Sequence, residues 1–267
     1  MYLGFRQLAV TGPSDTGFNL HFWRKSPEDE SHARDIPCGL LFLRNHNKGG
    51  WILFSNIDSI GGYGFQEVMI IWAITSSSYG IAFVVFGNSR RISQMIINGE
   101  LDSFLLQPKD ILLNIIASGT VISAWGDLFY GIILFIGVHG FDIAAFLLFI
   151  FFCITGALIF ASVIVFANSL TFYMGDSQGI TSLLTEFLIS FSIYPEGIYR
   201  GFTKFLIFTI IPAAFISLVP VRLIKNFTWG WFGILMTVVM AWMLFTYFFF
   251  KKGLKRYESG NLIVSKL

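Results

Sequence analysis

Residues 143–175 read IAAFLLFIFFCITGALIFASVIVFANSLTFYMG, 33 consecutive positions without a charged side chain. A helix rises about 1.5 Å per residue and needs roughly 20 apolar residues to cross the hydrocarbon core of a bilayer. Two further uncharged runs, residues 68–89 and residues 226–250, are also long enough to cross. These three runs predict transmembrane helices.

The composition of the whole chain agrees with a membrane protein. Of 267 residues, 55% are hydrophobic and 13% are charged, whereas soluble domains carry about 25% charged residues. The net charge of +2 comes from charges scattered along the chain, without the basic stripe that nucleic acid would require. We therefore expect an all-α integral membrane protein that does not bind nucleic acid.

Two other apolar segments each contain a single acid. Residues 111–141 contain Asp127, and residues 177–195 contain Glu186 at their midpoint. A carboxylate at the centre of a bilayer costs about 2.5–3.5 kcal/mol, which ten or more apolar neighbours offset. We expect both segments to span the membrane with the acid facing protein or water. Each acid then lines a substrate path or carries a proton, or else it pairs with a nearby polar group or lies nearer a membrane interface.

A shorter run, residues 205–221, contains Pro212 and Pro220. Proline removes a backbone donor and disrupts a helix, which suits broken helices that are packed inside protein. We predict a re-entrant pair of half-helices here, with a full span as the alternative. The expected fold is therefore a multi-pass helical bundle of five spans plus a re-entrant helical hairpin.

The distribution of basic residues orients these spans. The stretch 87–110 and the C-terminal tail together carry eight Lys and Arg residues, against four in residues 196–225. Basic residues are enriched on the cytoplasmic side of membrane proteins. We therefore expect both the stretch 87–110 and the C-terminus to be cytoplasmic.

Residues 1–50 differ from the rest of the chain. They hold six basic residues, five acidic residues and three of the four histidines, without a helical or strand period. We expect a disordered or poorly packed tail before a membrane domain at 51–267. A second interpretation is that a reading-frame shift replaced an original first span, because residues 51–55 resemble the end of an apolar helix whose beginning is missing.

The loop at residues 90–110 contains an amphipathic pattern. Ile92, Met95 and Ile96 recur at helical spacing, and Gly99 can end that helix. A short amphipathic helix on the cytoplasmic face can lie among lipid headgroups or dock in a groove on a soluble partner. The residues alone leave both uses open.

The motif Gly-Glu-Leu-Asp at residues 99–102, followed by Leu-Leu-Gln-Pro at 105–108, resembles the cytoplasmic loop of type 2 ATP-binding-cassette (ABC) permeases, closest to small bacterial permease subunits. Three further stretches agree in order and spacing: residues 59–64, residues 126–131, and Ile193 through Pro212. The resemblance covers roughly residues 51–267.

The resemblance implies six spans, with a cytoplasmic coupling helix between the second and the third and re-entrant helices before the last. By position, residues 68–89 match the second span, 90–109 the coupling region, 196–222 the re-entrant hairpin and 226–250 the sixth span. The first span of the family is absent from the place where residues 1–50 stand. The residues that this likeness assigns to ATPase coupling are Arg91, Gly99, Glu100, Leu101, Asp102, Phe104, Leu105, Gln107 and Pro108.

The sequence contains no Gly-x-x-x-x-Gly-Lys-Ser/Thr phosphate loop and no catalytic or metal-ligating constellation. We therefore expect a transport subunit rather than an enzyme, without a directly bound cofactor. As the family implies, it would export a hydrophobic or amphipathic substrate from a bacterial plasma membrane. Its expected partners are an ABC ATPase subunit that binds ATP, a second identical or homologous permease, and the lipid bilayer.

Two other functions fit the same residues. One is a transporter or channel that uses an ion gradient, with Asp127 and Glu186 as a relay. The other is a membrane scaffold that transports nothing.

Overall fold

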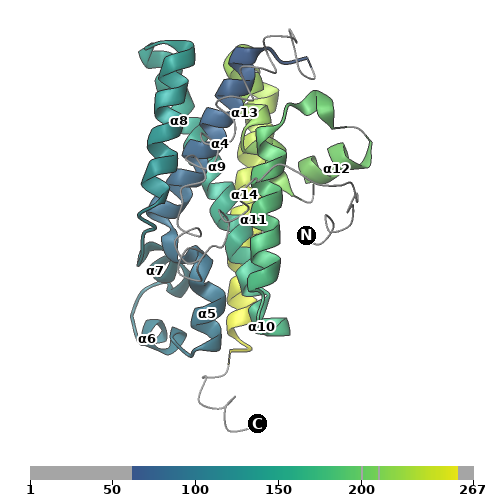
Figure 1. Cartoon of the computed structure of the whole chain (residues 1–267). Coiled ribbons are helices and arrows are strands. Elements are labelled where there is room, and N and C mark those ends of the chain that lie inside the picture. The colour runs from purple at the N-terminus through teal and green to yellow at the C-terminus, as the bar shows by residue number, and fades with distance from the viewer. Residues whose placement is uncertain (1–61, 200, 210, 258–267) are drawn as a thin grey trace, which may run out of the picture. The chain divides into compact units, whose positions relative to one another are not determined.

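The computed structural model describes residues 62–199, 201–209 and 211–257, and these residues form helices joined by turns (Figure 1). In chain order the elements are α4 (Phe65–Val85), η1 (Gly87–Arg91), α5 (Ile92–Ile97), α6 (Leu101–Leu105), α7 (Ile111–Ala117), α8 (Ala124–His139), α9 (Ile143–Ser169), α10 (Thr171–Met174), α11 (Gln178–Ile193), η2 (Glu196–Ile198), α12 (Phe202–Thr209), η3 (Pro212–Phe215), α13 (Leu218–Lys225) and α14 (Trp229–Leu254). The predicted tail at residues 1–50, and the hypothesis of a replaced first span, concern residues outside this description.

Helix α9 is the centre of the bundle, because it packs against α4, α11 and α14. Its 27 residues begin after Asp142, whose carboxylate accepts hydrogen bonds from the backbone nitrogens of Ala144 and Ala145. An acid at this position satisfies N–H groups that have no partner within the helix. Its apolar side chains, Phe152 and Phe160 among them, then fill the core between the neighbouring helices.

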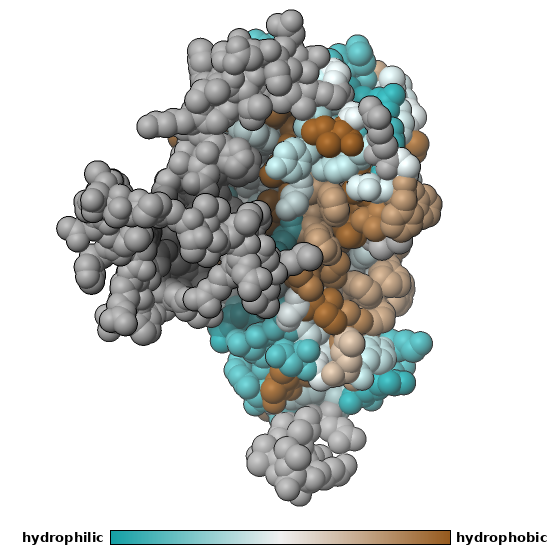
Figure 2. Space-filling model, turned by 45° about the vertical axis from the view of Figure 1, so that its right-hand side comes forward, coloured by the Kyte–Doolittle hydropathy of each residue, from teal (hydrophilic) through white to brown (hydrophobic). Residues whose placement is uncertain are grey.

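Three helices are long and apolar enough to cross a membrane: α4, the continuous stretch Ile143–Met174, and α14. They correspond to the three uncharged runs, so the prediction of transmembrane helices there is confirmed. Helices α8 and α11 are apolar but have 16 residues each. On the face in Figure 2, hydrophobic residues gather along the middle of the helices and hydrophilic ones at both ends, including the end that holds α5 and α10.

Residues 111–141, which we expect to span the membrane, contain two helices separated by a turn. Helix α7 ends at Ala117, and α8 begins at Ala124. Serine, glycine and threonine at positions 118–120 favour helix less than the residues around them. The turn also bonds to η1 and to the end of α4, since the Gly119 carbonyl accepts from the Gly87 nitrogen and the Val121 nitrogen donates to the Phe83 carbonyl, both at 3.0 Å. These contacts hold the break in place.

Small residues let α4 and α8 approach closely. A Cβ atom added to Gly131 would lie 2.2 Å from the Ser77 Oγ, and one added to Gly80 would lie 2.5 Å from the Leu128 nitrogen. The Ser76 hydroxyl donates to the Asp127 carbonyl across the same interface, at 2.9 Å. Glycine and serine at such positions give helices in membranes their packing and hydrogen bonds.

The predicted break between 205 and 221 is present. The segments Phe202–Thr209 and Pro212–Lys225 are bent by 61° relative to each other, which fits a re-entrant hairpin or a broken span. Pro212 is the first residue of η3, where the missing N–H would have no partner anyway. The Ser192 hydroxyl donates to the Ala213 carbonyl at 3.1 Å, which fixes η3 against the end of α11. Pro220 lies in the first turn of α13 and does not break it.

Candidate functional site

The chain between α4 and α8 folds into a small helical unit, which we call the 87–117 segment. It comprises η1, α5, α6 and α7 and lies at one end of the long helices (Figure 1). As the helical spacing predicts, Ile92, Met95 and Ile96 are all buried. They pack in one cluster with Val165 of α9 and Phe250 of α14. One face of the segment is therefore anchored on two membrane-crossing helices.

The turn after α5 forms as the sequence predicts. Helix α5 ends at Ile97, and Gly99 has a φ of 75°, a left-handed conformation that glycine adopts without a steric penalty. The Glu100 nitrogen donates back to the Met95 carbonyl at 2.9 Å. This turn reverses the chain and directs α6 away from α5.

A buried asparagine joins the segment to α9. Asn168 is fully buried, and its side-chain nitrogen donates to the carbonyls of Ser89 and Ile164, both at 3.0 Å. Its side-chain oxygen accepts from the Ser93 nitrogen at 3.4 Å. One amide thus satisfies backbone groups in η1, α5 and α9 at once.

The same contact extends to the start of α11. The Thr171 hydroxyl donates to the Ser93 Oγ at 2.7 Å and lies 2.6 Å from the Ser177 Oγ. The Ser93 hydroxyl in turn donates to the Asp176 carboxylate at 3.3 Å. We call these groups, with Asn168, the polar joint. A buried network whose groups are hydrogen-bonded is rigid, so the joint fixes α5 to the end of α9 and the start of α11.

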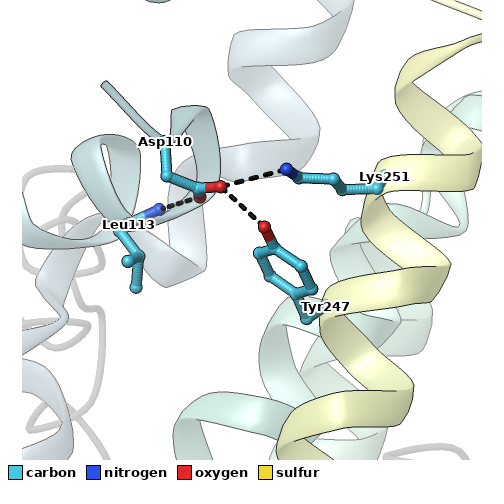
Figure 3. Close-up of polar contacts among 4 residues, drawn as sticks. All are labelled: Asp110, Leu113, Tyr247 and Lys251. Atoms are coloured by element: carbon cyan, nitrogen blue, oxygen red, sulfur yellow. Dashed lines mark hydrogen bonds and ion pairs between the residues drawn. The ribbon is translucent and has the colours of Figure 1, made fainter. Parts of the chain in front are cut away.

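A second polar contact ties the segment to α14 (Figure 3). The Asp110 carboxylate accepts from the Tyr247 hydroxyl at 2.8 Å and lies 3.2 Å from the Lys251 Nζ. Its other oxygen accepts from the Leu113 nitrogen at 3.2 Å, which caps the start of α7. Burial alone would raise the pKa of Asp110, but these hydrogen bonds outweigh burial and hold the pKa below its usual value.

We expect the Asp110→Asn variant to be less stable by roughly 1–2 kcal/mol at pH 7, because it loses the charge that faces Tyr247 and Lys251. The pKa of Asp110 is lower in the folded state than in the unfolded state. The contribution of the ionised carboxylate to the free energy of unfolding is therefore complete above the unfolded pKa of about 4, and it is lost as the pH falls through the folded-state pKa. Thermal unfolding of both proteins between pH 7 and pH 3 measures this difference.

The matched control for this variant is Asp142→Asn, at the N-terminus of α9. Each oxygen of that carboxylate accepts a hydrogen bond from one backbone nitrogen, that of Ala144 or Ala145, and an asparagine oxygen can still accept from one of them. A stability loss at Asp110 that is no larger than the loss at Asp142, or that persists unchanged at pH 3, would contradict the assignment.

The side of the segment that faces away from the long helices is exposed. Leu106 is 87% exposed and Leu105 is 42% exposed, although both are large apolar side chains. Polar and charged residues of the same segment are exposed as well: Gln94, Asn98, Glu100, Gln107 and Lys109. We call this surface the exposed tip. An apolar pair within a polar rim is typical of a surface that binds another protein.

The structure divides the residues that the resemblance assigned to ATPase coupling. Arg91, Glu100, Leu105, Gln107 and Pro108 are exposed, so they are available to a partner. Gly99, Asp102 and Phe104 are partly buried, and Leu101 is fully buried in the cluster below. Leu101 therefore supports the segment from inside and cannot present a contact surface.

Asp102 also faces the body of the protein. It lies beside Tyr257, which follows α14, and burial together with the Asp102 carboxylate raises the pKa of that tyrosine to about 12. Neither this contact of Asp102 nor the contacts of Ser93, Asp110 and Asn168 are among the sequence-based predictions. The role of Asn168 could have been predicted, because a polar amide near the end of a long apolar helix needs buried hydrogen-bond partners.

The two acids proposed for a substrate path are placed differently. Asp127 is 1% exposed and lies in the first turn of α8, close to a helix end rather than at mid-span. Glu186 is exposed, at the middle of α11. The two acids thus differ in both burial and position along their helices, and their part in transport stays a prediction.

These features define a helical, multi-pass membrane protein with an anchored segment at one end and an exposed surface on that segment. A family model described as ABC-2 family transporter protein matches residues 50–260. The chain therefore belongs to the ABC-2 family, and it is a permease component of an ABC transporter that works with an ABC ATPase subunit. No curated protein and no solved structure matches the chain.

Proposed function

We propose that the chain exports a hydrophobic or amphipathic substrate across a bacterial plasma membrane, driven by ATP that a separate subunit hydrolyses. That ATPase subunit docks on the exposed tip, and a second permease, identical or homologous, completes the pathway. The observation that carries the proposal is the arrangement of the 87–117 segment, which exposes an apolar pair on one side and is held by side-chain contacts on the other.

The contacts of the segment give a route for mechanical force. When the ATPase subunit moves the exposed tip, α5 carries the movement through the polar joint to the end of α9 and the start of α11. The Asp110 contact carries it to α14. Both contacts use several hydrogen bonds, so the helices move with the segment instead of sliding past it.

The charges support a cytoplasmic position for this end of the protein. The Asp110–Lys251 contact places the 87–117 segment beside the C-terminal end of α14. Basic residues from both stretches therefore gather at one end: Arg90, Arg91, Lys109, Lys251, Lys252, Lys255 and Arg256. This accumulation agrees with the positive-inside tendency and supports a cytoplasmic C-terminus.

Affinity purification of the tagged chain from gently solubilised membranes, with identification of every co-purifying protein, tests the proposal. We expect a stoichiometric soluble subunit that carries a phosphate-loop ATPase motif. If the chain instead purifies folded and without such a subunit, the proposal fails. Flux in sealed vesicles that follows an ion gradient and ignores ATP would favour the alternative in which Asp127 and Glu186 relay ions.

A further inference from the structure

Helix α11 presents a face that no described helix covers. Ser182, Leu183, Glu186, Phe187 and Ser190 recur at helical spacing and are all exposed, while the opposite face of the helix is packed against α9 and η3. Glu186 is the single charged residue of α11 and lies at its midpoint. The exposed stripe is therefore apolar and small-polar, with one negative charge at its centre.

This face is poorly suited to lipid chains. An ionised carboxylate at the middle of a membrane helix is unfavourable in hydrocarbon and requires water, protein or a counter-charge. Among the described residues, Glu67, Asp110 and Glu196 form ion pairs with lysines, and none of these pairs involves Glu186. The stripe is therefore suited to face water or protein rather than lipid chains, and its negative charge is exposed to a ligand.

The neighbours of Glu186 suit an organic cation. Phe187, the next residue, is 45% exposed, and its ring centroid lies 5.9 Å from that of Phe191. Phe191 is partly buried and packs against the core, so Phe187 is the ring exposed on this face. Aromatic faces attract cations, and Leu183 adds apolar surface one helical turn away. A carboxylate among such groups complements a ligand that is both positively charged and hydrophobic.

We propose that the exposed face of α11 binds a hydrophobic organic cation, with the Glu186 carboxylate as its counter-charge. This inference rests on the proposed transport function and names its substrate class. Helix α11 begins at the polar joint, because Ser177 precedes its first residue. Movement of the 87–117 segment therefore shifts the helix that carries the binding face.

The test measures binding of tetraphenylphosphonium to the purified complex in lipid nanodiscs by equilibrium dialysis against empty nanodiscs, without ATP. We expect saturable binding that the Glu186→Gln variant weakens by at least about tenfold, since the charge pair is lost in a poorly screened site. Glu186→Asp keeps the charge and retains most of the affinity. The neutral probe tetraphenylmethane is expected to be insensitive to Glu186.

The matched control is Glu196→Gln, which removes an acid that is paired with Lys204 outside α11. It is expected to leave binding unchanged. Absence of saturable binding to the wild type, or equal binding to the Glu186→Gln variant, would overturn the proposal. A Glu186→Gln variant that changes the number of permease copies in the complex, without a selective loss of cation binding, would instead identify the face as a subunit contact and also overturn it.

Failure of this inference and failure of the transport proposal give different results. If the protein binds the cation through Glu186 but purifies without an ATPase subunit, the proposed binding site is supported and the ATP-driven mechanism is contradicted. If the protein purifies with an ATPase subunit but does not bind the cation, the ATP-driven mechanism is supported and the proposed binding site is contradicted.

Discussion

Replacement of Gly131 with leucine is expected to prevent the protein from accumulating in folded form. A Cβ atom at this position would lie 2.2 Å from the Ser77 Oγ and 2.4 Å from the Ala73 carbonyl oxygen, so the whole leucine side chain would have to force α8 away from α4. Helix α4 also packs against α9, which prevents it from moving aside. Overpacking of this kind costs about 3 kcal/mol or more, a large part of a total stability of roughly 5–15 kcal/mol.

The same helix offers the control. An added Cβ at Gly137 would have no atom within 4 Å, so Gly137→Leu adds the same side chain to α8 without a clash. Fluorescence-detected size-exclusion chromatography of tagged variants compares the folded yields. Equal yields of the two variants would show that the close approach of α4 and α8 is not needed for folding.

Replacement of both Leu105 and Leu106 with aspartate is expected to abolish association with the ATPase subunit while the permease remains folded. These side chains form the apolar centre of the exposed tip. Loss of one buried anchor of an interface costs about 2 kcal/mol or more, so loss of both corresponds to a roughly 1,000-fold weaker complex. Two acids in place of the apolar pair add a desolvation cost.

This effect is measured by co-purification of the ATPase subunit, alongside the thermal stability of the permease. The control is Phe141→Asp, which also removes an apolar side chain that is 72% exposed, in the turn after α8 and outside the 87–117 segment. It is expected to leave association unchanged. If the Leu105/Leu106 variant co-purifies as much ATPase subunit as the wild type, the exposed tip is not the docking surface.

The Asp110 and tip variants separate two functions of one segment. The tip variant removes the surface that receives the ATPase subunit, whereas Asp110→Asn loosens the contact that anchors the segment on α14. We expect the Asp110 variant to keep its ATPase partner. Co-purification of that variant therefore distinguishes docking from anchoring.

Local patterns in the sequence were sufficient for the membrane helices and for the inner face of the segment. A run of 20 or more uncharged residues has one stable place, which is the hydrocarbon core, so α4, α9 and α14 follow from the spacing of charges. The burial of Ile92 and its neighbours, and the turn at Gly99, follow equally from helical spacing and from the conformational freedom of glycine. In both cases the cause lies within one continuous stretch of the chain.

Other features depended on groups that are distant in the chain. The break at residues 118–123 is held by contacts with the end of α4, and it places Asp127 near a helix end instead of at mid-span. Leu101 belongs to a motif that suggested a contact surface, yet its position in the cluster buries it. Asn168 forms a hydrogen bond with Ser89, which is 79 residues away in the sequence, and Asp110 forms one with Tyr247, which is 137 residues away. Hydrophobic spacing thus determined which segments are helices in the membrane, whereas the pairing of their polar groups was decided only by tertiary packing, because a hydrogen bond forms only when both partners are brought within about 3 Å.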